Sequence, residues 1–175
     1  AAAKDRRIVL LTGDLGYSAL EPIRDRFPDR FLNMGLSEQN MVGFAAGLAL
    51  AGKIPLVYSI ATFMTLKTME QLRNDVCYQK LNVKVVGVGA GLTYAPLGAT
   101  HHATEDIALM RLLPHMKVIC PGDPVEVTGA VEAMLKDPAP CYLRIGARGE
   151  PNIHLKPIAF RIGRGNRVRP GKEEV

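Results

Sequence analysis

Short apolar runs without polar alternation recur along this chain, and segments with a helical pattern lie between them. The run Val83–Val88, for example, is rich in β-branched residues. Strands of this composition are buried on both faces, which is typical of parallel sheets covered by helices. The sequence therefore predicts an α/β fold with a mostly parallel sheet and helices on both faces. In such sheets, ligands bind at the carboxyl ends of the strands, where the connecting loops gather.

The pattern predicts strands at Arg7–Thr12, Phe31–Met34, Ile54–Ser59, Val83–Val88, Lys117–Cys120 and Cys141–Ile145. It predicts a short helix that ends near Phe27 and further helices at Glu38–Ala51, from Phe63 to about Gln79, at Thr104–Leu113 and at Val125–Leu135. After Gly146 the composition changes. We therefore expect residues 1–150 to form one domain and residues 151–175 to form a linker toward a C-terminal domain that is missing here.

The distribution of charge argues against a nucleic-acid-binding surface. The formal net charge is +5, but residues 161–175 carry five basic and two acidic side chains, which leaves a net charge of only +2 for the rest. The uncharged run Met41–Ala51 is shorter than the ~20 residues of a membrane-spanning helix. Three widely spaced cysteines fit reduced thiols. We expect a cytoplasmic protein that binds neither nucleic acid nor membrane.

Glu38 stands at the entrance to an uncharged segment that is rich in Gly and Ala. Ser37 is suited to the N-cap position, so Glu38 falls in the first helical turn. A helix with apolar side chains on all sides is expected to be buried, and burial raises the pKa of a carboxyl group. The neutral acid can donate a hydrogen bond. From the residues alone, Glu38 is either such a functional acid or a complement to the helix dipole.

Four motifs follow one another in the sequence: "DRFLNMGLSEQNM", "ATF", "THHATEDIALMR" and "PGDPVE". In this order and spacing they resemble the pyrimidine-binding domain of transketolase-like, thiamine-diphosphate-dependent enzymes. The resemblance extends from "TGDLGYS" to "YLRIG". Within the family, the sequence is similar to the separate C-terminal subunits of split transketolases. The resemblance implies the thiamine-diphosphate-binding fold. The beta subunits of 2-oxoacid dehydrogenases and 1-deoxyxylulose-5-phosphate synthases share this domain type and remain alternatives.

The resemblance also implies roles for individual residues. Glu38 matches the catalytic glutamate, which hydrogen-bonds N1′ of the cofactor's aminopyrimidine and favours the tautomer whose exocyclic nitrogen deprotonates C2 of the thiazolium. His101 matches an active-site histidine near the substrate, and His102 replaces a common Gln beside it. Phe63 matches the aromatic side chain that stacks on the pyrimidine, with a core phenylalanine as the alternative.

Asp14 and Leu15 match a pair that approaches the cofactor near the subunit contact, although a simple strand-end turn would explain them as well. Arg144 lies where sugar-phosphate-binding members carry an arginine, and a guanidinium suits phosphate; an exposed strand-end Arg is the alternative. Leu97 stands where many transketolases carry an acidic residue that contacts a sugar hydroxyl, which argues against the ordinary pentose-phosphate substrates.

The resemblance implies thiamine diphosphate as cofactor, with Mg²⁺ or Ca²⁺ held by a diphosphate-binding subunit or domain, because the family's "GDG…N" motif is absent from this sequence. It implies transfer of a two-carbon ketol unit between sugars or sugar phosphates and no activity without the partner. The small, uncharged run Met41–Ala51 suits close packing of two copies, so we also expect a homodimer. We expect no metal site in the chain itself, although His102, Glu105 and Asp106 could share a helix face. The glycines of "VGVGAG" suggest dinucleotide binding only weakly, because a loop rather than a helix follows them.

Overall fold

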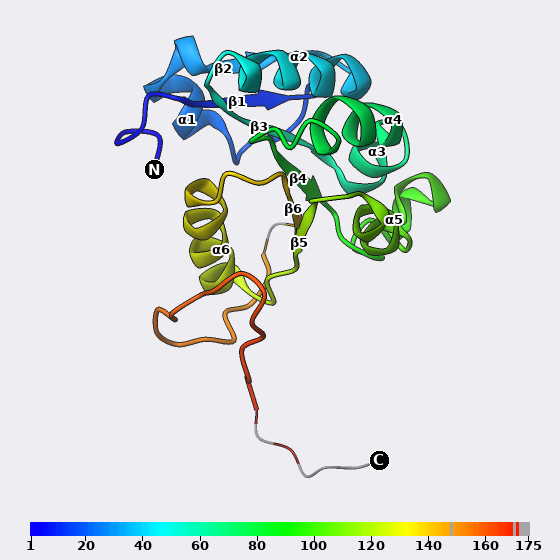
Figure 1. The fold of residues 1–175 in the computed structure, drawn as a ribbon. Coiled ribbons are helices and arrows are strands. Elements are labelled where there is room, and N and C mark those ends of the chain that lie inside the picture. Colours follow the sequence, from blue (N-terminus) through cyan, green and yellow to red (C-terminus); the bar gives the residue numbers. More distant parts are fainter. Residues whose placement is uncertain (148, 170, 172–175) are drawn as a thin grey trace.

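The computed structural model describes residues 1–147, 149–169 and 171. Six strands form one sheet in the order β2-β1-β3-β4-β6-β5, and every neighbouring pair is parallel (Figure 1). The strands are β1 (Ile8–Thr12), β2 (Phe31–Asn33), β3 (Ile54–Ile60), β4 (Lys84–Val88), β5 (Lys117–Ile119) and β6 (Cys141–Ile145). Each predicted strand is confirmed to within one residue at either end, and so is the predicted parallel α/β class.

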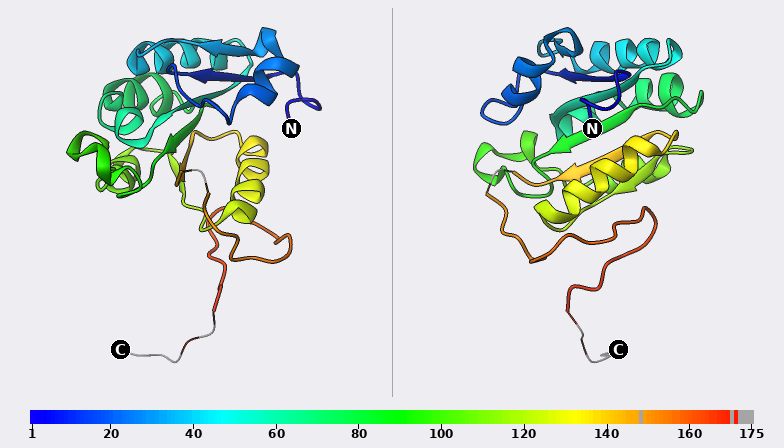
Figure 2. Two further views of the ribbon diagram at one scale, coloured as in Figure 1. Left: turned by 180° about the vertical axis from the view of Figure 1, so that it is seen from behind. Right: turned by 90° about the vertical axis from the view of Figure 1, so that its left-hand side faces the viewer.

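Helices cover both faces of the sheet (Figure 2). One face carries α2 (Glu38–Leu50), α3 (Ala61–Thr65), α4 (Met69–Gln71), the π-helical turn η2 (Leu72–Cys77) and α5 (Asp106–Leu112). The other face carries α1 (Glu21–Arg26) and α6 (Pro124–Lys136). Short 3₁₀ turns lie in the connections, at η1 (Pro28–Arg30), η3 (Ala95–Leu97) and η4 (Ala99–His101). The two faces have separate hydrophobic cores, the larger one under α2, α3, η2 and α5 and the smaller one under α6. No helix in the described ranges is long and apolar enough to cross a membrane.

The prediction of a single helix from Phe63 to about Gln79 is wrong. The helical segment begins two residues earlier, at Ala61, and is divided into α3, α4 and η2. Near the division, the hydroxyls of Thr65 and Thr68 donate to the carbonyl oxygens of Ala61 and Met64, four residues back. Such bonds compete with the backbone ladder, and π-turns interrupt α-helices. Lys67, which contacts Glu38, lies within this interruption, between the end of α3 and the start of α4.

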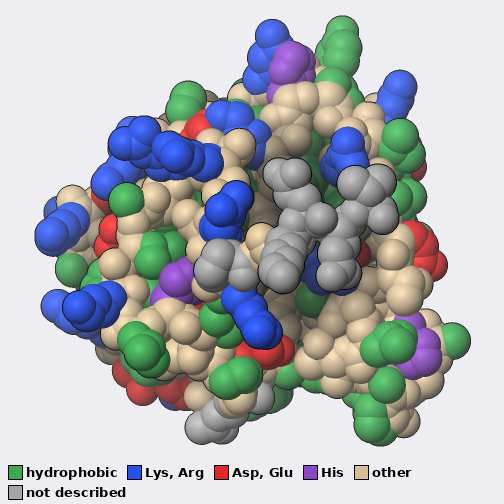
Figure 3. Space-filling view, turned by 90° about the horizontal axis from the view of Figure 1, so that it is seen from below, with side chains coloured by type: hydrophobic (Ala, Val, Ile, Leu, Met, Phe, Trp, Pro, Cys, Tyr) green, Lys and Arg blue, Asp and Glu red, His purple; other side chains and the backbone are tan. Residues whose placement is uncertain are grey.

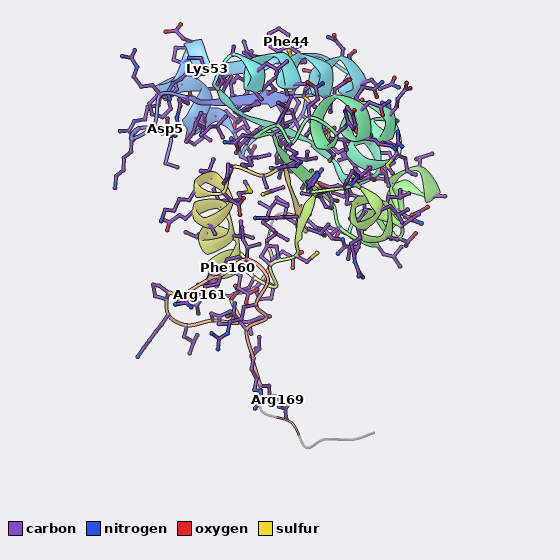
Figure 4. All side chains as sticks on the ribbon, viewed as in Figure 1. Asp5, Phe44, Lys53, Phe160, Arg161 and Arg169 are labelled. Atoms are coloured by element: carbon purple, nitrogen blue, oxygen red, sulfur yellow. The ribbon has the colours of Figure 1, made fainter. Side chains whose placement is uncertain are left out.

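The expectation that the helix opened by Glu38 is buried on all sides is wrong for the single chain. The inner side of α2 is buried, but Gly43, Phe44, Gly47 and Leu50 are exposed. Phe44 lies on the side of α2 that faces away from the sheet (Figure 4). The charge-free sequence of α2 does not distinguish burial within one chain from burial against another.

Residues that follow β6 pack on α6. The side chains of Phe160 and Ile162 contact the smaller core, and Phe160 lies so close to Gly129 of α6 that an added Cβ would meet it at 2.6 Å. Asp123 caps α6 by accepting from the backbone of Glu126, and its other carboxylate oxygen accepts from the backbone of His154. The first part of the expected linker is therefore held against the sheet domain. Basic side chains are spread in several groups over the lower side of the molecule (Figure 3).

Candidate functional site

All candidate residues but one follow the carboxyl end of a strand. Asp14 follows β1, Glu38 opens α2 after β2, Phe63 lies in α3 after β3, and His101 lies in η4 after β4. Arg144 lies in β6 itself, one residue before its end. Because the sheet is entirely parallel, these ends share one edge, where connecting loops form ligand sites.

Glu38 is buried, with 1% of its surface exposed. Its Oε1 accepts a hydrogen bond of 3.1 Å from Ser59 of β3, and its Oε2 accepts one of 2.5 Å from the ammonium of Lys67. Gly13, directly after β1, lies beside this carboxylate, and a Cβ there would meet Oε1 at an ordinary contact distance of 3.5 Å. Ser37 occupies the N-cap position, but within the described residues its side chain makes no capping hydrogen bond. The carboxylate is therefore held by tertiary contacts.

The expected rise in the pKa of Glu38 is not found. Burial alone would raise it, but hydrogen bonds from Lys67, from the backbone N–H of Glu38 and from Ser59 together hold the pKa below its usual range. The prediction considered desolvation without the cation that contacts the carboxylate. In this chain Glu38 is therefore a carboxylate rather than a neutral acid.

Phe63, Lys67 and His101 form a cluster next to this carboxylate. The Lys67 ammonium lies 5.0 Å from the centroid of the Phe63 ring, and the His101 imidazole meets that ring edge-on at a centroid distance of 5.2 Å. The loop that carries His101 is tied to α3, because the hydroxyl of Thr62 donates to the carbonyl oxygen of Thr100 at 3.1 Å. The hydroxyl of Thr100 lies 2.9 Å from Nδ1 of His101. The structure thus brings His101 together with Phe63 and Lys67, from a distant part of the sequence.

Asp14 and Leu15 form the turn after β1. Asp14 has a left-handed backbone with φ of +56°, and its Oδ1 accepts from Asn33 at 2.8 Å and from Tyr17 at 3.1 Å. The carbonyl oxygen of Leu15 accepts from Thr12 at 2.7 Å. Asn33 also accepts from the backbone N–H of Asp14, so it joins the ends of β1 and β2. These contacts fit the strand-end turn, and they leave the expected cofactor contact a prediction.

Arg144 is held in place by a buried acid. Its Nε donates to Oδ2 of Asp106 at 2.8 Å, and the hydroxyl of Tyr142 donates to the same oxygen at 2.8 Å. Burial, followed by the nearby charge of Asp106, raises the pKa of Tyr142. The side chain of Arg144 remains 21% exposed. It lines a cavity of about 670 Å³ at the carboxyl edge, together with Leu15, Tyr17, Tyr58 and Tyr94 among others.

His102, Glu105 and Asp106, the residues considered as a metal group, each contact other parts of the chain. Nε2 of His102 lies 3.2 Å from the carbonyl oxygen of Ala95, Glu105 accepts from Thr104, and Asp106 holds Arg144. Among the residues that the structure describes, no three His, Cys, Asp or Glu side chains gather into a group that could hold a metal ion.

Three residues of this site were given no role from the sequence, namely Asn33, Ser59 and Lys67, and Asp106 was considered only as a possible metal ligand. Lys67 offered a signal, because it carries the sole charge between Ile54 and Met69 and follows Phe63 by about one helical turn. Asp106 offered a weaker one, as an acidic residue that opens a helix. Asn33 lies within the motif "DRFLNMGLSEQNM" but was given no role, and Ser59 offered no signal.

The aromatic and carboxylate pair fits the pyrimidine part of the expected cofactor. A buried carboxylate stands next to a half-buried aromatic ring, which are the two groups that an aminopyrimidine requires for its ring nitrogen and its face. Lys67 now occupies both groups. The residues present are therefore of the right kind for this part of the cofactor.

Comparisons with known proteins agree with the fold. Residues 1–148 match the family described as the transketolase pyrimidine-binding domain. The chain is 36% identical over 152 residues to an apulose-4-phosphate transketolase subunit of Actinobacillus succinogenes, covering 87% of this chain and 49% of that protein. It is 36% identical over 171 residues to the 6-deoxy-6-sulfo-D-fructose transketolase subunit SqwH of a Clostridium species, covering 97% and 53%.

Solved structures give the same result. A structure described as a split-gene transketolase, an inactive beta4 tetramer, is 38% identical, with a TM-score of 0.85 over 97% of this chain and 55% of that one. The transketolase of Campylobacter jejuni shares the fold, with a TM-score of 0.74 at 19% identity over 83% of this chain and 23% of that one. The chain spans about half the length of the curated relatives named above. By its matched residues and its fold, this chain belongs to the transketolase pyrimidine-binding domain family.

Proposed function

We propose that this chain is the pyrimidine-binding part of a thiamine-diphosphate-dependent transketolase that transfers a two-carbon ketol unit between sugars. The observation that carries the proposal is the buried Glu38 carboxylate next to Phe63, with His101 on the same ring. When bound, thiamine diphosphate supplies the carbon nucleophile that carries the two-carbon unit. The relatives' names, which refer to transketolase subunits, support the same reaction class.

The residues of this chain have separate tasks in the proposed reaction. Glu38 would hold a proton at the ring nitrogen of the pyrimidine, and Phe63 would support the face of that ring. His101, at the edge of the Phe63 ring, would donate to or accept from the oxygens of the sugar. Asp14 and Leu15 would line the approach to the cofactor, and His102 would contact substrate from the neighbouring loop.

We assign the diphosphate and its divalent cation to a partner subunit, as the family resemblance implies. The chain alone would then be inactive and would bind thiamine diphosphate weakly. Self-association is supported by the exposed apolar and glycine residues of α2. A similar chain is described as an inactive beta4 tetramer, which is consistent with assembly of copies. The free thiols of Cys77, Cys120 and Cys141 support a reducing location such as the cytoplasm.

We propose a ketose with an anionic end group as substrate. Arg144 is oriented by Asp106 and partly exposed in the 670 Å³ cavity, so part of its guanidinium can meet phosphate or sulfonate. Leu97, in η3, is 58% exposed and offers no acid to a sugar hydroxyl. The names of relatives refer to apulose 4-phosphate and to 6-deoxy-6-sulfo-D-fructose, which both carry an anionic group.

The test is an assay of the chain with a diphosphate-binding subunit, thiamine diphosphate and Mg²⁺. Ketose phosphates and 2-oxoacids are offered as donors in parallel. Ketol transfer from a ketose phosphate is the expected result. Turnover of 2-oxoacids alone would favour the dehydrogenase alternative, and condensation of pyruvate with an aldose phosphate would favour the 1-deoxyxylulose-5-phosphate synthase alternative, for which relatives at 38% identity exist.

A further inference from the structure

Lys67 connects the two groups that a pyrimidine ring would contact. Its Nζ lies 2.5 Å from Oε2 of Glu38 and 5.0 Å from the centroid of the Phe63 ring. The lysine follows Phe63 in the segment between α3 and α4, where the helix is interrupted. Its side chain is 48% exposed, while that of Glu38 is 1% exposed. The cation therefore covers the buried carboxylate from the solvent side.

The carboxylate needs this cation or a proton. A buried charged group without a partner is strongly unfavourable and normally becomes neutral. The hydroxyl of Ser59 satisfies Oε1, and Lys67 satisfies Oε2. While the ammonium is present Glu38 is a carboxylate, which only accepts hydrogen bonds, so a ring nitrogen that is itself an acceptor finds no donor on it. A ring that stacks on the face of Phe63 next to Glu38 meets the same ammonium.

We propose that Lys67 determines what enters the pyrimidine site, because its ammonium holds Glu38 and Phe63 until a heteroaromatic ring with a nitrogen acceptor displaces it into solvent. This inference rests on the proposed function and adds to it a gate made by the chain itself. Displacement costs little for the lysine, because nearly half of its side chain is already exposed. A ring without a nitrogen acceptor gains nothing from Glu38 that would offset the lost ion pair.

The exchange moves one proton. In the free chain Glu38 is a carboxylate paired with an ammonium, and a carboxylate cannot donate to a ring nitrogen. When Lys67 leaves, Glu38 takes up one proton from solvent and donates it in a hydrogen bond to the ring. Lys67 keeps its own charge. Binding of the neutral ring therefore consumes one proton, and affinity falls about tenfold per pH unit above neutrality.

Other titratable groups on the neighbouring elements are Asp14, after β1, and His101, in η4. Asp14 is already held by Asn33 and Tyr17, and His101 contacts the edge of Phe63. The measured proton uptake is therefore assigned to Glu38 only if the uptake disappears in Glu38→Gln. Lys67→Met removes the ammonium and keeps most of the side-chain length. Lys67→Arg keeps the charge, and Lys53→Met removes an exposed lysine from the turn after α2 as a matched control.

The first measurement follows the ¹³C signal of the Glu38 carboxyl group against pH in the full chain without ligand. Lys67→Met is expected to shift its titration to higher pH, while Lys67→Arg and Lys53→Met leave it in place. The second is calorimetry of thiamine diphosphate with Mg²⁺ on the complex with the diphosphate-binding subunit, in buffers of different ionisation enthalpy. Uptake close to one proton is expected for the wild type and clearly less for Lys67→Met. At pH 8, Lys67→Met should bind about tenfold more tightly.

An unchanged titration in Lys67→Met would overturn the inference, as would tighter binding by the wild type or the absence of proton uptake. If no variant binds thiamine diphosphate, the proposed function fails, and so does the displacement step. The carboxyl titration would in that case still report whether Lys67 holds Glu38 in its charged form.

Discussion

The imidazole of His101 meets the ring of Phe63 edge-on, with the centroids 5.2 Å apart and the planes inclined by 63°. This contact joins the segment after β3 to the loop after β4. Because aromatic rings prefer such edge-to-face geometry, the contact orients both side chains at the carboxyl edge of the sheet. The ring of Phe63 is thus fixed between a histidine and the Lys67 ammonium.

Replacement of Phe63 by leucine is expected to weaken binding of thiamine diphosphate to the assembled enzyme about tenfold, because aromatic stacking contributes roughly 0.5–1.5 kcal/mol beyond area burial. Calorimetry on the complex measures the effect. Phe27→Leu, which changes a ring that contacts Arg26 and Arg30, serves as the control. Equal affinities of Phe63→Leu and wild type would rule out stacking on this ring.

Replacement of Arg144 by methionine is expected to raise KM for a ketose phosphate at least tenfold and to leave KM for the same ketose without phosphate nearly unchanged. The reason is that a guanidinium contributes binding energy to an anionic group and not to a neutral one. Steady-state kinetics with both donors gives the ratio. Arg73→Met, on the surface of η2, is the control. A parallel loss with both donors would mean that Arg144 acts through Asp106 and the fold.

Asp123 is expected to make the free energy of unfolding decrease as the pH falls into the acid range. Burial would raise its pKa, but hydrogen bonds from the backbone of His154 and Glu126, from the His154 side chain and from the backbone of Ile153 lower the pKa to about 2. A lowered folded pKa stabilises the fold above the unfolded value near ~3.9, and this contribution is lost as pH falls toward 2. Asp123→Asn should therefore be less stable than wild type at pH 6, with the difference narrowing between pH 4 and pH 2.

Urea unfolding at several pH values tests this expectation. Asp29→Asn is the control, because Asp29 is exposed and makes no side-chain hydrogen bond in the part of the chain that the structure describes. A constant difference between Asp123→Asn and wild type from pH 6 to pH 2 would contradict the assignment.

Replacement of Gly47 by leucine tests whether the exposed side of α2 is a free surface or an interface between copies of the chain. An added Cβ at Gly47 meets nothing within 4 Å in the described chain, and glycine weakens helices, so the substitution should not destabilise a single copy. If copies pack through α2, the bulky side chain blocks their approach. Sedimentation at tens of micromolar should then show a shift from assembly to single chains. Gly165→Leu is the control, and an unchanged assembly in Gly47→Leu would place the interface elsewhere.

The strands and their parallel arrangement could be predicted because each strand is a compact apolar run, and burial on both faces leaves few alternatives for such runs. Glu38 could be found as a candidate because a carboxylate at the start of an uncharged helix is unusual. The charge state of Glu38 could not be predicted, since Lys67 lies 29 residues away in the sequence and only the fold brings the two side chains into contact. The interruption after α3 was likewise hidden, because it involves threonine hydroxyls that bond to the backbone.

The most direct measurement of the central claim is exchange of the C2 proton of thiamine diphosphate, followed by NMR in the complex with the diphosphate-binding subunit, for Glu38→Gln and His101→Ala. Glu38→Gln should slow exchange about 100-fold or more, in the range of general acid–base effects. His101→Ala should leave exchange within about threefold of wild type while turnover falls, because His101 is expected to act on the sugar. Equal loss of exchange in both variants, or loss in His101→Ala alone, would contradict the roles assigned to these residues.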